Sequence, residues 1–76
     1  MNVYPNPASD VINFSFPAEQ NDAQLKLYDV TGRALKVIAF AGKKLTLKRD
    51  GLSDGVYIYK CYTGTKISNS GRIVIL

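Results

Sequence analysis

Apolar residues alternate with polar ones at a period of two along most of this chain, and no stretch keeps the i, i+3, i+4, i+7 spacing of an amphipathic helix. The clearest stretch is Val11 to Phe16, where every second residue would point to the same face of a strand. Pro17 is predicted to end this strand, because proline cannot donate to a sheet ladder. A further extended segment is predicted around Ile67. The same pattern predicts strands at 23–29, 34–40, 44–48, 56–62 and 72–76.

Short strands that recur every ~8 to 12 residues favour two packed antiparallel sheets, since no helix is available to connect parallel strands. The segment from Leu52 to Tyr57 has the Leu, Gly and Tyr spacing of a tyrosine corner, in which the phenol bonds to upstream backbone. The predicted fold is therefore an all-β, immunoglobulin-like antiparallel β-sandwich of about seven short strands. The side chains predicted to be largely buried are Ile12, Phe14, Leu25, Leu27, Leu47, Tyr57 and Tyr59.

The chain has 76 residues, and we predict one domain, 1–76, because two cores would leave each half too little apolar surface to offset chain entropy. It is 46% hydrophobic and 21% charged, which is typical of a folded domain. No apolar run approaches the ~20 residues that span a bilayer, and residues 1–16 lack the features of a signal peptide. We therefore expect any export signal to lie on a longer parent chain.

The strand predicted at 56–62 contains the single cysteine, Cys61, so no intramolecular disulfide can form. Because Lys60 belongs on the solvent side, alternation directs Tyr57, Tyr59 and Cys61 toward the core. A buried free thiol is the resulting prediction, since cysteine behaves there as a small hydrophobic residue.

Histidine is absent, which removes the commonest general base near neutral pH and the commonest metal ligand. No serine stands with a lysine in a recognisable catalytic motif, so we predict no enzymatic activity and no cofactor. The Asp-Gly pairs at 50–51 and 54–55 lack the order of a calcium loop and indicate turns. A base-stacking platform of tyrosines is disfavoured, because alternation places Tyr62 on the face opposite to Tyr57 and Tyr59.

Charge is divided unevenly along the chain. Residues 1–33 carry two basic and four acidic residues, a net charge of −2, whereas residues 34–76 carry eight basic and two acidic residues, a net charge of +6. This predicts weak, salt-sensitive attraction to polyanions such as nucleic acid or lipopolysaccharide. A solvated basic surface is the simpler interpretation, so nucleic acid is not a predicted partner.

Four segments stand out for their order and spacing: VYPNPASD at 3–10, LYDVTGR at 27–33, LSDGVYIYK at 52–60 and GRIVIL at 71–76. Packing and turn chemistry explain most of these residues, because the prolines in the first segment stiffen a turn that Asn6 can cap. Together, from Val3 to the last residue, they resemble the type A C-terminal sorting domain of the type IX secretion system. Two residues depart from that family's usual pattern: Arg72 replaces a lysine, and Cys61 replaces valine or isoleucine.

The resemblance implies a secretion and sorting signal that directs its parent protein to the cell surface or exterior of a Gram-negative bacterium, through the periplasm and outer membrane. The implied partners are the outer-membrane translocon, a shuttle protein and a sortase that removes the domain. An immunoglobulin-like accessory module that binds carbohydrate or cell surface for an attached enzyme is the alternative. The position of the segment in the parent gene distinguishes the two. A homodimer of the isolated domain, paired through edge strands, is also expected to be accessible.

Recognition is expected to depend on the proline-rich entry segment, on two turns, and on the last strand with a free chain end. The predicted recognition residues are Tyr4, Pro5, Asn6, Pro7, Gly32, Arg33, Gly55, Tyr57, Gly71, Arg72, Ile73, Val74, Ile75 and Leu76.

Overall fold

Five β-strands and no helix make up the computed structural model, which describes residues 1–76. The strands are β1 (Asn2–Tyr4), β2 (Val11–Tyr28), β3 (Ala34–Lys48), β4 (Gly55–Thr63) and β5 (Lys66–Ile75). All strand pairs are antiparallel, in the order β1-β2-β4-β5, and β3 runs along the other side of β2. The structure contains no helix with the length and hydropathy that crossing a membrane requires.

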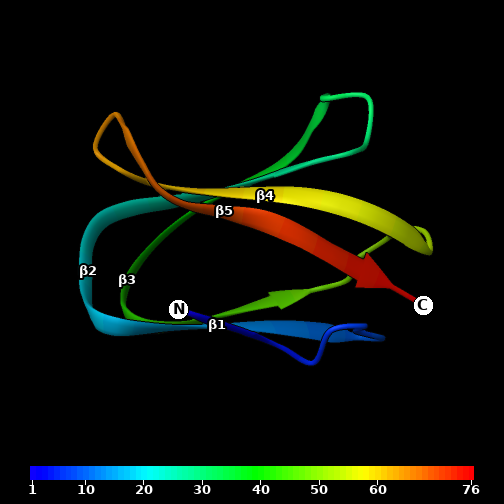
Figure 1. Ribbon diagram of the computed structural model, residues 1–76, viewed down its shortest axis with the longest axis horizontal. Helices are drawn as coiled ribbons and strands as arrows, with labels where there is room; N and C mark the ends of the chain where they lie inside the picture. The colour runs from blue at the N-terminus through cyan, green and yellow to red at the C-terminus, as the bar shows by residue number, and fades with distance from the viewer.

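The two longest strands bend, and the bend turns one sheet into two facing layers (Figure 1). The first half of β2, at 11–15, pairs with β1 and with residues 44–48 of β3. Its second half, at 23–28, pairs with residues 34–40 of β3 and with β4, which pairs in turn with β5. Register shifts on either side of Gln20 mark the bend. The result is an all-β antiparallel sandwich, consistent with the predicted immunoglobulin-like fold.

The predicted number of about seven strands is wrong, because three pairs of predicted segments are continuous in β2, β3 and β5, and β1 is an additional strand. Pro17 does not end its strand. It lies between Ser15 and Gln20, where β2 is not paired with β3. Proline therefore costs the sheet no hydrogen bond to β3 at this position, although it lacks an N–H. A turn is predicted at 41–43, between the strands predicted at 34–40 and 44–48, but Gly42 lies within β3 opposite Gln20 with a φ of 97°. A side chain at that φ would be strained, which suits glycine to the bend.

The strands at the two ends of the chain also differ from the prediction. β5 begins at Lys66, so the extended segment around Ile67 and the predicted last strand form one element, and Leu76 lies outside it. The sequence pattern predicts no strand at β1, because three residues are too few to show a period.

Side chains from both layers meet in one core, and every residue predicted to be buried is buried. The Phe14 ring from β2 meets the Tyr59 ring from β4 edge to face, with centroids 5.3 Å apart. Cys61 is 1% exposed, so the buried thiol is confirmed, and burial raises its pKa to about 11. The other buried residues are Ala8, Ile12, Phe16, Ala23, Leu25, Leu27, Leu47, Tyr57, Ile73 and Ile75.

The tyrosine corner is confirmed at the connection between the layers. The Tyr57 hydroxyl donates to the carbonyl oxygen of Ser53 at 2.5 Å, and Leu52 packs against the core beside it. A phenol that is 5% exposed needs such a partner, because an unpaired buried hydroxyl is costly. The bond therefore ties the connection that follows β3 to the start of β4.

Candidate functional site

The proline-flanked Asn6 binds the outer edge of β5 through its side chain. Its Nδ2 donates to the carbonyl oxygen of Arg72 at 3.3 Å, and the N–H of Val74 donates to its Oδ1 at 3.1 Å. A primary amide carries one donor group and one acceptor, so it can replace the N–H and C=O of a neighbouring strand. Pro5 and Pro7 have no N–H to offer that edge, and both of their preceding peptide bonds are cis.

Two residues later, main-chain atoms continue the pairing. The N–H of Ala8 donates to the carbonyl oxygen of Val74 at 2.8 Å, and the N–H of Leu76 donates to the carbonyl oxygen of Ala8 at 2.9 Å. Ala8 thereby forms a parallel bridge with Ile75. We call residues 6–8 and 72–76, bound in this way, the terminal clasp. It covers a strand edge that would otherwise be open to pairing with another chain.

Arg49, which is not among the predicted recognition residues, binds one end of the terminal clasp. Its Nη1 donates to the carbonyl oxygens of Ser9 at 3.3 Å and Leu76 at 3.4 Å, and its Nε donates to that of Leu52 at 2.7 Å. Nη2 forms an ion pair with Asp54. Arginine suits this position because its planar guanidinium presents several donors in fixed directions. No sequence pattern distinguishes Arg49 from the other basic residues.

Three predicted recognition residues occupy positions that packing and pairing explain. Gly55 opens β4 opposite Ile75, and Tyr57 is buried in the core. Gly71 lies opposite Tyr59, where a methyl group would stand 2.6 Å from the tyrosine Oη. Glycine therefore leaves room for the Tyr59 ring to cover the strand at this position.

The last strand presents alternate residues to the core and to solvent. Ile73 and Ile75 are fully buried, and Val74 is half-buried. Arg72 is exposed, Leu76 is 65% exposed, and Tyr4 in the entry segment is 45% exposed. Pro5, Asn6 and Pro7 are exposed as well. The surface of the terminal clasp therefore carries a cationic and an aliphatic side chain, and the exposed Tyr4 lies just before it in the chain.

The turn that contains Gly32 and Arg33 stands apart from this site, as the green loop at the top of Figure 1. The Asp29 carboxylate accepts from the Thr31 hydroxyl at 2.5 Å, from the Thr31 N–H at 2.9 Å and from the Arg33 N–H at 3.0 Å. These hydrogen bonds lower the pKa of Asp29, and the bond from the Thr31 hydroxyl has the largest effect. Gly32 has a φ of 90°, which favours glycine at the reversal.

A family model described as "Secretion system C-terminal sorting domain" matches residues 2–76. The chain belongs to this family. No curated protein and no solved structure matches the chain. The protein is thus a C-terminal sorting signal for type IX secretion, as the four sequence segments predict. This role implies interaction with the secretion machinery and export to the cell surface or beyond it, and the family is not known to be catalytic.

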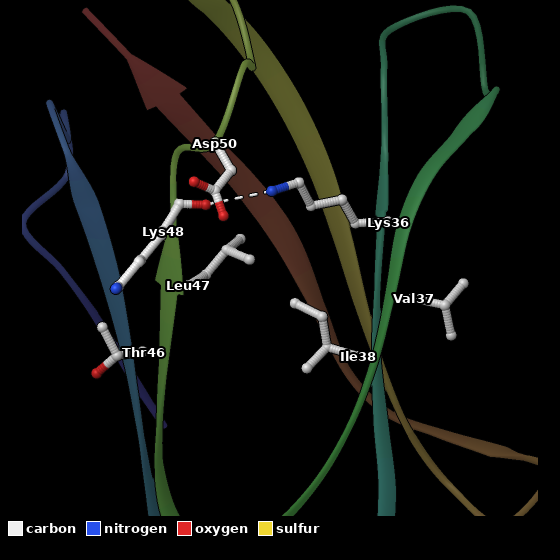
Figure 2. Close-up of a pocket in the computed structure, with 7 residues that line it drawn as sticks. All are labelled: Lys36, Val37, Ile38, Thr46, Leu47, Lys48 and Asp50. Atoms are coloured by element: carbon white, nitrogen blue, oxygen red, sulfur yellow. Dashed lines mark hydrogen bonds between the residues drawn. The ribbon is translucent and has the colours of Figure 1, made fainter.

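The sorting domain has one groove, on the open side of the sandwich between the two halves of β3 (Figure 2). Its volume is about 430 Å³, and the Lys36 ammonium donates across it to the carbonyl oxygen of Lys48 at 3.3 Å. No predicted recognition residue lines the groove, and nowhere do three His, Cys, Asp or Glu residues gather as metal ligands. The lining residues are Lys36, Val37, Ile38, Thr46, Leu47, Lys48 and Asp50.

Proposed function

We propose that the terminal clasp is the surface of the sorting domain that the secretion machinery reads. In this proposal a shuttle protein and the outer-membrane translocon bind the clasp during passage from the periplasm across the outer membrane, and a sortase acts on the domain afterwards. The observation that carries the proposal is the pair of hydrogen bonds between the Asn6 side chain and β5. Those bonds join the first of the four sequence segments to the last.

The third segment also reaches the clasp, because Gly55 at the start of β4 pairs with Ile75. Three of the four segments that mark the family therefore meet at one end of the sandwich (Figure 1). Binding without chemistry suits this surface, since Arg72 is exposed on it and the exposed Tyr4 lies two residues before Asn6. Tyrosine and arginine are enriched among the residues that dominate binding at protein interfaces.

The test reverses the charge of Arg72 in a domain fused to a reporter that enters the periplasm of a host with the secretion system. Arg72→Glu leaves the main-chain carbonyl that Asn6 binds, so it changes the surface and keeps the hydrogen bond. We expect export of the reporter to the cell surface to fall at least several-fold, because one reversed charge at an interface weakens partner binding.

Lys66→Glu is the matched control, since Lys66 is an exposed cation at the other end of the same strand. Both variants are first compared with the native domain by far-UV circular dichroism and urea unfolding. Native export of a folded Arg72→Glu fusion, or equal loss with Lys66→Glu, would contradict recognition at the clasp.

A further inference from the structure

β3 pairs with no strand other than β2, so its other edge is open in both layers. In its second half, at 44–48, every residue pairs with β2 on one side and with no strand on the other. Open edges of this kind present main-chain N–H and C=O groups that a further strand can bind. The terminal clasp covers the edge of β5 at 72–76, whereas no segment of the chain pairs with the open edge of β3.

The groove beside this edge is apolar at its base. Leu45 and Leu47 pair with the core residues Phe14 and Ile12, and so point between the layers. Leu47 and Ile38 lie on the two sides of the groove in Figure 2, one from each half of β3. Leu45 and Ile38 are only partly buried, because no strand lies beyond β3 to cover them. An added strand would cover them with its inward side chains.

Charge on β3 restricts what such a strand can be. The strand carries four lysines and no acidic residue, so a second copy of β3 would bring like charges together. Lys44 and Lys48 pair with Ser15 and Val11 on the solvent face, on either side of Thr46. Acidic residues four positions apart in a neighbouring strand would stand opposite these two lysines, because paired strands keep the same spacing.

We propose that residues 44–48 of β3 bind an extended segment of a partner protein in which acidic and apolar residues alternate. The segment adds a strand to the sheet: its main chain pairs with β3, its apolar side chains enter the groove, and its acidic side chains face Lys44 and Lys48. This interaction is separate from the sorting surface, and it does not depend on recognition of the terminal clasp.

The test uses a synthetic seven-residue peptide that alternates glutamate and valine, titrated into the whole domain by calorimetry and by NMR. A second peptide carries N-methyl groups on alternate residues, which keeps its charge and removes its ability to pair as a strand. We expect the first peptide to bind and to slow amide exchange at 44–48, and the N-methylated peptide to bind at least about tenfold more weakly.

The protein variant is the double substitution Lys44→Glu and Lys48→Glu, and its matched control is Lys26→Glu with Lys60→Glu on the outer face of the other layer. Circular dichroism checks that both remain folded. The first variant should lose about tenfold in affinity for the peptide, and the control less than about twofold. Both variants change the net charge equally, so the difference between them reports the position of the lysines. No binding at millimolar peptide, equal losses in both variants, or equal binding of the N-methylated peptide would overturn strand addition.

Discussion

Replacing Gly71 with alanine tests whether a residue in the last family segment is there for packing. Gly71 does not have a positive φ, so its backbone conformation accepts alanine without strain. The added methyl group would lie 2.6 Å from Oη of Tyr59 and 2.8 Å from its Cε2 and Cζ. The ring cannot easily retreat, because it is 7% exposed and packs edge to face with the Phe14 ring.

Two opposing effects determine the change in the free energy of unfolding. Alanine reduces the entropy of the unfolded chain relative to glycine, which stabilises by ~0.4–1 kcal/mol. Forcing an extra carbon into a packed core costs ~1–3 kcal/mol. Overpacking is the larger effect, so Gly71→Ala should destabilise the domain by about 1–2 kcal/mol. For a domain of this size that is a large part of a total of ~5–15 kcal/mol.

Urea unfolding followed by far-UV circular dichroism measures this change, and a second background isolates its cause. In a Tyr59→Leu domain the ring is gone, so Gly71→Ala should be neutral or stabilising by up to ~1 kcal/mol. Equal destabilisation in both backgrounds would refute contact with the ring as the reason for glycine. A Gly71→Ala domain as stable as the native one would refute the packing argument altogether.

Three further predictions concern groups whose partners the structure identifies. Tyr57→Phe should lower the free energy of urea unfolding by ~0.5–1.5 kcal/mol, because the bond to the connection before β4 is lost, whereas Tyr62→Phe should not. The pKa of Asp29 is lower in the folded state, so the Asp29 carboxylate stabilises the fold. This stabilisation is present above the unfolded pKa of ~3.9 and is lost as pH falls through the folded-state pKa. Asp29→Asn should therefore reduce the fall in thermal midpoint between neutral pH and about pH 2, and an unchanged fall would contradict this. With a pKa of about 11, buried Cys61 should react with a thiol reagent at neutral pH only when urea unfolds the domain, and rapid reaction of native protein would argue against its burial.

The direction of side chains in the strands around 11–16, 23–28 and 56–62 could be predicted from the sequence, because alternation in a strand is a local property of the backbone. Lys60 was sufficient to direct Tyr57, Tyr59 and Cys61 inward, and all three are buried. The number of strands could not be predicted in this way. Whether a chain bends at a bulge or stops at a turn depends on the partner strand, and at Pro17 the partner makes no pair.

The sequence also determined the family, because the order of four short segments is itself a linear property and the family model matches 2–76. How those segments come together in one surface depends on contacts between distant parts of the chain. The Asn6 side chain and the Arg72 carbonyl are 66 positions apart, and Arg49 joins both ends of the chain to the connection before β4. No pattern along the chain reports such contacts. They exist because two layers must face each other to bury the core, and that packing brings the entry segment onto the edge of β5.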